Sequence, residues 1–289
     1  MQSKPVSVKS WGLKAVLFLL FLAVGLLIFV VFSHFRPLLP GMKDRTGRLI
    51  LVLGFLSMAL LVRGIPRLAK YWRIPFAFFI AALVTAIDLY LPSRVWLLNT
   101  LKVPLQTPAG IALDKLDSSL VIILGILLLN FVSGGRLSDL YLKKGNLKQG
   151  LTIGLIAFIV SAAGSIPFSQ AFFNARSLTL SGVLPWIPWI LIFVFGNAFN
   201  EELLFRGLFL GKYQPLLGRF LANLVIAIPF ALHHSGVSYT QDTLMFLALL
   251  IPLSLVWGWL TQKTGSLWGA ILFHAGTDIP VVLSIFSNL

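Results

Sequence analysis

The sequence predicts an all-α, polytopic membrane protein: a bundle of about 8–9 transmembrane helices with an intramembrane polar cavity. Two observations carry this prediction. Of 289 residues, 58% are hydrophobic and 11% are charged, whereas globular chains carry about a quarter charged residues. The apolar residues also gather into runs long enough to cross a bilayer at 1.5 Å of helix rise per residue. This composition excludes a soluble enzyme, a disordered chain and a nucleic-acid binder.

Nine apolar runs are the expected spans, and each is justified by its length and by the scarcity of charge within it. In chain order they are Trp11–Phe32, Leu49–Leu61, Pro75–Leu91, Ser118–Val132, Gly150–Phe168, Trp186–Leu210, Phe220–Leu232, Thr243–Leu260 and Leu267–Phe286. The stretch Ser93–Asp117 mixes charges and prolines with leucines. We expect this stretch to lie in the membrane interface or to re-enter the membrane.

The chain shows no repeat, low-complexity tract or long polar linker, so we expect one membrane-embedded unit. Residues 1–150 hold 18 Lys and Arg against 5 acidic residues, and residues 151–289 hold 5 against 4. Basic residues that separate apolar runs indicate contact with lipid headgroups, so the net charge of +14 does not indicate nucleic acid. The basic loops and the absence of cysteine suit a bacterial plasma membrane.

The two glutamates of the chain, Glu201 and Glu202, lie inside an apolar run, and Arg206 follows the second by four residues. Each charge at a helix centre opposes insertion by about 2.5–3.5 kcal/mol, so these groups must face each other or water. On a helix, Glu202 and Arg206 are close enough for an ion pair, while Glu201 points away and can serve as a proton acceptor. A packing triad without chemistry is the alternative.

Histidines add to this pattern in the later apolar runs. Phe230 and His234 are four residues apart, as are His274 and Asp278, so each pair shares a helix face. A single histidine on an apolar helix is more often structural. Two such pairs together with the glutamates favour a common site.

These residues resemble three motifs of the CAAX protease and bacteriocin-processing (CPBP, Abi) family of intramembrane proteases. Glu201–Gly207 is similar to its EExxxR motif, Phe230–His234 to FxxxH, and His274–Asp278 to HxxxN/D. The three occur in the family's order. The resemblance covers about residues 185–287, which we take as the catalytic helices, whereas residues 1–184 are N-terminal helices of unassigned role.

The resemblance implies an intramembrane endopeptidase that cleaves a membrane-associated or lipidated substrate with a glutamate-activated water. It implies Glu201, Glu202, His234 and His274 as catalytic residues, Glu201 being the general base, with Arg206, Phe230 and Asp278 in support. Asp278 occupies a motif position at which some relatives have asparagine. An ionised aspartate cannot donate to an oxyanion, so Asp278 must be protonated, orient His274 or help to bind a metal.

A metal remains an open alternative at this stage. Glu201, His234 and His274 could hold zinc or a similar divalent ion, but the sequence has no HExxH motif. A glutamate base with histidine donors needs no metal, and we prefer a reaction that requires no cofactor.

Two other classes of function stay open. Intramembrane charges also mark an ion or proton-coupled transporter, and a catalytically silent membrane scaffold could carry the same residues. The absence of GxGD and GxSG disfavours aspartyl and serine intramembrane proteases. The expected partners are the lipid bilayer and a peptide or lipidated protein whose identity the sequence does not reveal.

Overall fold

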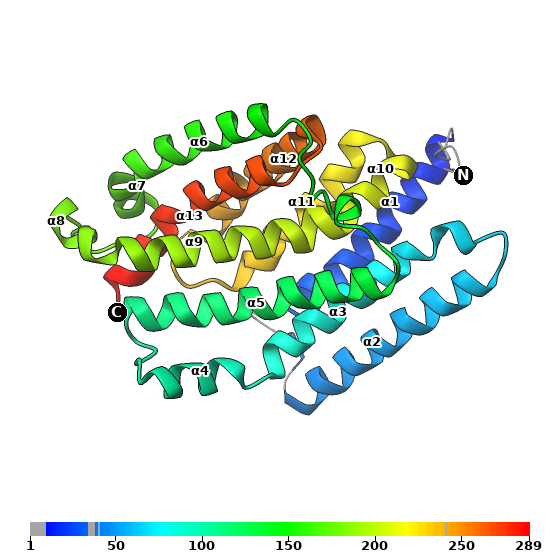
Figure 1. Ribbon diagram of the computed structural model, residues 1–289, viewed down its shortest axis with the longest axis horizontal. Helices are drawn as coiled ribbons and strands as arrows, with labels where there is room; N and C mark the ends of the chain where they lie inside the picture. The colour runs from blue at the N-terminus through cyan, green and yellow to red at the C-terminus, as the bar shows by residue number, and fades with distance from the viewer. Residues whose placement is uncertain (1–9, 34–37, 40, 241) are drawn as a thin grey trace.

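The protein folds as an all-helical bundle, with no strand among the described residues (Figure 1). The computed structural model describes residues 10–33, 38–39, 41–240 and 242–289. In these residues seven helices are long and apolar enough to cross a membrane, or eight if one bent pair of helices is counted as a span. The all-α polytopic fold is therefore confirmed.

The elements follow one another with short connections. They are α1 (Trp11–Leu26), η1 (Leu27–Val31), α2 (Gly41–Gly64), η2 (Ala69–Tyr71), α3 (Arg73–Tyr90), α4 (Ser93–Leu101), α5 (Pro108–Val132), η3 (Leu137–Leu140), α6 (Leu147–Ala163), α7 (Ser165–Phe172), α8 (Leu180–Val183), η4 (Leu184–Trp186), α9 (Ile187–Glu202), η5 (Leu203–Leu210), α10 (Gly211–Leu217), α11 (Arg219–His233), η6 (His234–Gly236), α12 (Thr243–Thr264) and α13 (Trp268–Ser287).

Three elements differ from the expected spans. Helix α11 has 15 residues, too few to cross roughly 30 Å of hydrocarbon, although its run was expected to be a span. Helix α5 begins at Pro108, where Thr107 caps it by accepting a hydrogen bond from the Gly110 amide, so the last ten residues of the expected interfacial stretch belong to a long span. The run Gly150–Phe168 is broken, because α6 and α7 meet at 65°.

Helix α13 lies at the centre of the C-terminal half. It packs against α6, α7, α9 and α12. Of its most apolar 18 residues 67% are buried, against 17% for the N-terminal span Trp11–Val31. Glycines allow the close approach to α6: the backbone of Gly269 lies against Gly150 and Gly154, as small residues commonly do between membrane helices. This packing fixes the position of His274, which α13 carries.

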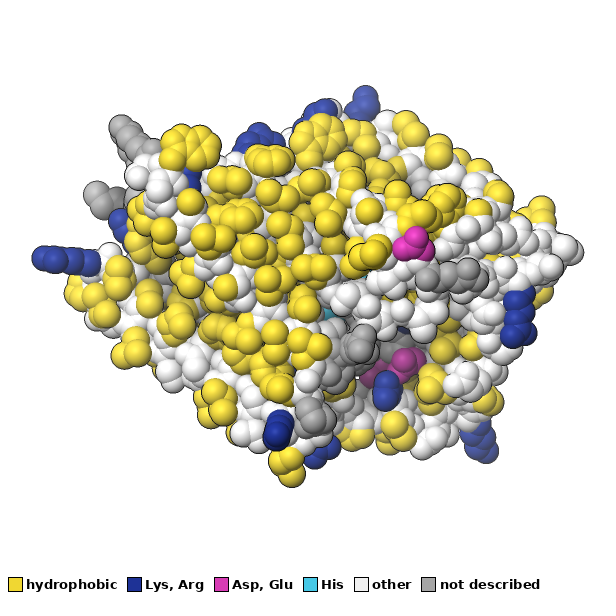
Figure 2. Space-filling view, turned by 180° about the vertical axis from the view of Figure 1, so that it is seen from behind, with side chains coloured by type: hydrophobic (Ala, Val, Ile, Leu, Met, Phe, Trp, Pro, Cys, Tyr) yellow, Lys and Arg dark blue, Asp and Glu magenta, His cyan; other side chains and the backbone are white. Residues whose placement is uncertain are grey.

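The outer surface is dominated by hydrophobic side chains (Figure 2). Helices α2 and α6 contribute many exposed apolar side chains, including Leu53, Leu61, Ile156 and Ile159. A soluble protein rarely exposes an apolar surface of this extent, whereas in a bilayer these side chains face lipid.

Candidate active site

A cavity of about 950 Å³ lies between α5, α6, α9, α11, α12 and α13. Most of its lining side chains are apolar, and the polar ones include Asn197, Glu201, His234, His274 and Asp278. In Figure 2 a small part of a histidine side chain is visible between the surrounding side chains. The expected polar groups thus line one part of a largely apolar chamber.

Helix α9 positions both glutamates at its C-terminal end, and a π-helical segment, η5, continues it from Leu203. Such segments occur frequently at functional sites. Arg206 lies in η5 and its Nη1 donates to Glu202 Oε1 over 2.9 Å, with both side chains fully buried. Glu202 therefore takes the arginine and Glu201 does not, as helix geometry predicted.

Arg206 is further held by α12 and by two aromatic rings. Its Nη2 donates to the Ser254 carbonyl over 2.9 Å and to Ser254 Oγ over 2.6 Å. Its guanidinium carbon lies 4.6 Å from the Phe230 ring centroid and 5.4 Å from that of Trp257. Because each contact fixes the planar guanidinium, Glu202 is held in one place.

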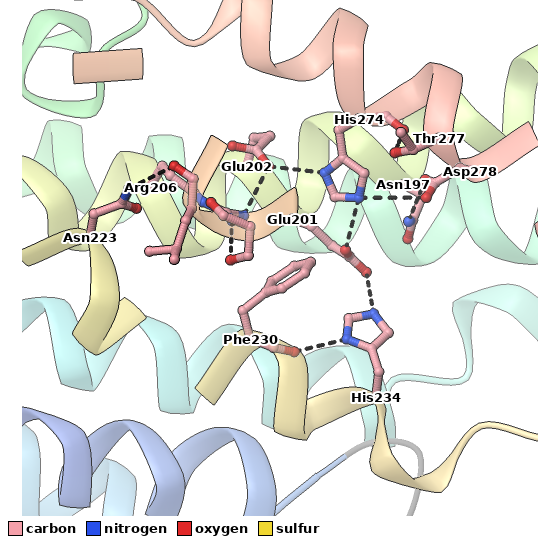
Figure 3. Close-up of polar contacts among 12 residues, drawn as sticks. Asn197, Glu201, Glu202, Arg206, Asn223, Phe230, His234, His274, Thr277 and Asp278 are labelled. Atoms are coloured by element: carbon pink, nitrogen blue, oxygen red, sulfur yellow. Dashed lines mark hydrogen bonds and ion pairs between the residues drawn. The ribbon is translucent and has the colours of Figure 1, made fainter. Parts of the chain in front are cut away.

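His274 connects the two glutamates (Figure 3). Its Nδ1 lies 2.9 Å from Glu202 Oε1, and its Nε2 lies 3.5 Å from both Glu201 Oε2 and Asp278 Oδ1. The ring stacks on Trp257 at 3.9 Å between centroids. With Nδ1–H donating to Glu202, Nε2 is the nitrogen that faces the cavity acids, so a proton on it would be attracted by both carboxylates.

His234 reaches Glu201 from the opposite side. It lies in η6, directly after the short helix α11, and its Nδ1 is 2.8 Å from the Phe230 carbonyl oxygen. Because that oxygen can only accept, Nδ1 carries the proton and Nε2 faces Glu201 Oε1 at 3.7 Å. Helix α11 ends at His233, which leaves His234 beside Glu201.

Asp278 lies one helical turn after His274 and is contacted by a residue that sequence reasoning missed. Asn197 Nδ2 donates to Asp278 Oδ2 over 2.9 Å. Asn197 is 8% exposed, lines the cavity and precedes Glu201 by four residues, so the two share a face of α9. That spacing was the signal in the sequence that could have identified it.

The other missed residues are Ser254 and Trp257 of α12. No pattern in the sequence singles them out, since a serine and a tryptophan in an apolar helix are common. Tyr239 also lines the cavity from the loop before α12. Burial, reinforced by the Glu201 and Asp278 carboxylates, raises the pKa of the Tyr239 hydroxyl well above its ordinary value, so Tyr239 adds no charge there.

A divalent metal was the open alternative for Glu201, His234 and His274. Among the described residues, no three His, Cys, Asp or Glu side chains are arranged so that they could hold a metal ion. Glu201 Oε2 lies 3.5 Å from His274 Nε2, and Glu201 Oε1 lies 3.7 Å from His234 Nε2. A carboxylate base flanked by two imidazoles can act without a metal.

Together these contacts bring Glu201, Glu202, His234 and His274 into one cluster at the cavity, and one known family matches the part of the chain that carries them. Residues 183–280 match the family described as Type II CAAX prenyl endopeptidase Rce1-like. The resemblance carried by the three motifs is thereby confirmed, and the match supports a CAAX-type intramembrane endopeptidase. No curated protein and no solved structure matches the chain.

Proposed function

We propose that the protein hydrolyses a peptide bond of a membrane-anchored substrate with a water activated by Glu201. One observation carries the proposal: the Glu201 carboxylate lies at the cavity wall between the Nε2 atoms of His234 and His274. Glu202, by contrast, is occupied by Arg206 and His274. Of the two glutamates, Glu201 is therefore the one able to take a proton from a water in the cavity.

The reaction follows from this placement. A water in the cavity gives a proton to Glu201 while its oxygen bonds to the carbonyl carbon of the scissile peptide. Negative charge develops on the carbonyl oxygen. When the C–N bond breaks, the proton held by Glu201 passes to the departing nitrogen, which leaves a free amine and a carboxylic acid. Glu201 is then ionised again.

The developing oxyanion needs donors, and Asn197 is well placed to provide one. One Nδ2 hydrogen donates to Asp278 Oδ2, which leaves the second available to the cavity. We assign the oxyanion contacts to Asn197 and to a protonated His274 Nε2, with Asp278 orienting the amide. Asp278 then accepts the hydrogen bond from Asn197, so an aspartate at this position, in place of the asparagine of some relatives, is compatible with catalysis.

The cavity also supports a substrate class. Its lining is mainly apolar, and it lies within helices that cross the membrane. A peptide carrying a lipid chain, or a hydrophobic segment, would enter it at lower desolvation cost than a polar peptide. We propose that the protein resides in a bacterial plasma membrane and that its substrates are held in the same membrane.

The test uses the purified full chain in detergent or liposomes with a farnesylated peptide as reporter. The parent protein should cleave it, and Glu201→Gln should lose about 100- to 10,000-fold in kcat, because that is the usual contribution of a general base. An unchanged melting temperature would show that the variant is folded. Full activity in Glu201→Gln would refute the mechanism, and ion flux without cleavage would favour the transporter.

A further inference from the structure

A second groove lies between α11 and α12 and opens to the outer surface of the bundle. Its volume is about 540 Å³, within the range of about 300–1,000 Å³ that is usual for ligand sites. Of its described lining residues, only Val256 also lines the active-site cavity. The groove is therefore a separate site, and the reaction proposed above does not use it.

The walls of this groove are mostly apolar. Phe220, Val256 and Trp259 line it and are exposed at the outer surface. Asn223 lines it as well but is buried, and its Nδ2 joins the two helices by donating to the Leu255 carbonyl over 2.8 Å. An apolar groove that faces the hydrocarbon of a bilayer has space for an acyl chain.

One end of the groove is basic. Arg219 lines it, and the Arg219 carbonyl accepts a hydrogen bond from Gln262 Nε2 over 2.9 Å, so the start of α11 lies beside the end of α12. The next residue, Lys263, has its Nζ 4.5 Å from the centroid of the Trp259 ring in the groove wall. Arg219 and Lys263 are both exposed. Neither forms an ion pair with another described residue, and no described Asp or Glu lines the groove.

This basic end lies at the surface of the bilayer. Helix α12 ends at Thr264, whose carbonyl accepts a hydrogen bond from the Asn146 amide over 2.7 Å. Asn146 belongs to the loop between α5 and α6, which is rich in Lys and Arg, as cytoplasmic loops are. An exposed tryptophan such as Trp259 is typical of the headgroup region. Basic pockets between membrane helices on the cytoplasmic side bind acidic lipid headgroups.

Charge selects among the lipids that could occupy the groove. Two cations without acidic partners attract a headgroup of net negative charge more than a zwitterionic one, whose own ammonium offsets part of the attraction. The guanidinium of Arg219 can also contact a phosphate through two parallel N–H groups. The basic end and the apolar walls thus match the two parts of one anionic phospholipid.

We propose that the groove between α11 and α12 binds one anionic glycerophospholipid, with its phosphate at Arg219 and Lys263 and an acyl chain along Phe220 and Val256. This site is independent of the proposed function, because none of the groups that act on the peptide bond lines the groove. Free phosphate shares the headgroup chemistry but lacks the acyl chain, so the experiment includes it as a competitor.

Binding is measured on the purified full chain in detergent micelles by native mass spectrometry, which counts the bound lipids. The protein is titrated with dioleoylphosphatidylglycerol and, separately, with dioleoylphosphatidylcholine, which has the same acyl chains and no net charge. A third titration adds inorganic phosphate in excess to the phosphatidylglycerol complex. The melting temperature of each variant without lipid shows that it is folded.

One phosphatidylglycerol should bind at least about tenfold more tightly than phosphatidylcholine, because each Lys or Arg beside an acidic lipid contributes about fivefold in affinity. Arg219→Gln/Lys263→Gln should bring this ratio to near one. Lys143→Gln/Lys144→Gln is the matched control. It removes the same charge from the loop beside the end of α12, but neither residue lines the groove, so the ratio should stay.

Equal binding of the two lipids by the parent protein would overturn the proposal without reference to any variant. A ratio that survives Arg219→Gln/Lys263→Gln, or one that the lysine control lowers as much, would show a general attraction of the basic surface instead. Displacement of the lipid by inorganic phosphate would leave the acyl chain no part in binding. A dimer that takes up no lipid would assign the groove to a second copy of the chain.

Discussion

Two buried acid–arginine pairs, each four residues apart on one helix, lie in different halves of the molecule. In α2, Arg48 Nε donates to Asp44 Oδ2 over 2.8 Å, Tyr90 donates to the same carboxylate oxygen, and Arg48 also reaches the Ser33 carbonyl. In the α9–η5 segment, Arg206 pairs with Glu202 over 2.9 Å. In local geometry the two pairs are alike.

Their surroundings differ. Neither Asp44 nor Arg48 lines the cavity, whereas Glu202 adjoins Glu201, which does. Glu202 also accepts a hydrogen bond from His274 Nδ1. This contact orients the imidazole so that its Nε2 faces the cavity. A buried ion pair is therefore weak evidence for catalysis. What distinguishes the second pair is a neighbouring carboxylate that the arginine leaves available beside two imidazoles.

The sharpest comparison removes each arginine. Arg206→Met and Arg48→Met should each lower the free energy of unfolding by about 3 kcal/mol or more, because each leaves a buried carboxylate uncompensated. Neutralising the partner as well should restore much of the stability in both cases. Glu202→Gln/Arg206→Met should be inactive, because His274 loses its contact with the Glu202 carboxylate. Asp44→Asn/Arg48→Met should cleave the reporter at the parent rate.

Thermal unfolding in detergent and reporter cleavage, measured on the same preparations, check these four variants. If the Asp44→Asn/Arg48→Met protein were stable but inactive, the N-terminal pair would have a part in function and the contrast between the two regions would be lost.

The next largest effect is expected at Asn197. Asn197→Ala should lower kcat about 100-fold with little change in KM, as the loss of one oxyanion donor does. Asn197→Ala/Asp278→Asn should recover at least about tenfold, because it returns an amide to the same place. A merely structural asparagine would not be rescued in this way, so a double variant no better than the single one contradicts the assignment.

A smaller effect is expected at Tyr90. Tyr90→Phe removes one hydrogen bond to the Asp44 carboxylate and should lower the free energy of unfolding by about 1.5 kcal/mol, with cleavage unchanged. Denaturant or thermal titration measures the first quantity. A drop in kcat without a change in stability would tie the N-terminal cluster to the active site.

The smallest effect concerns metal. Extended dialysis against a chelator should change cleavage by less than about twofold, because in the proposed mechanism Glu201 activates the water without a metal. Activity is compared before and after dialysis, with and without added zinc. Loss of activity that zinc restores would require a metal-based mechanism.

Several features of the site could be read from residue spacing. The Glu202–Arg206 pair follows from a four-residue interval on one helix, and the same interval explains Phe230 with His234 and His274 with Asp278. Spacing did not reveal the break between α6 and α7, and the short run Phe220–Leu232 was nevertheless counted as a membrane span. The course of these segments depends on how neighbouring helices pack around them. The average hydropathy of a stretch of sequence carries no information on that packing.

The sequence by itself determined that this is a helical membrane protein and which charged and imidazole side chains lie inside its apolar segments, because hydropathy and helical periodicity act within a single segment. The tertiary structure alone decided that α11 ends beside Glu201, that His274 contacts both glutamates, and that Asn197 lines the same cavity as Glu201. These relations join residues far apart in the chain. They arise from the packing of whole helices, which no local pattern specifies.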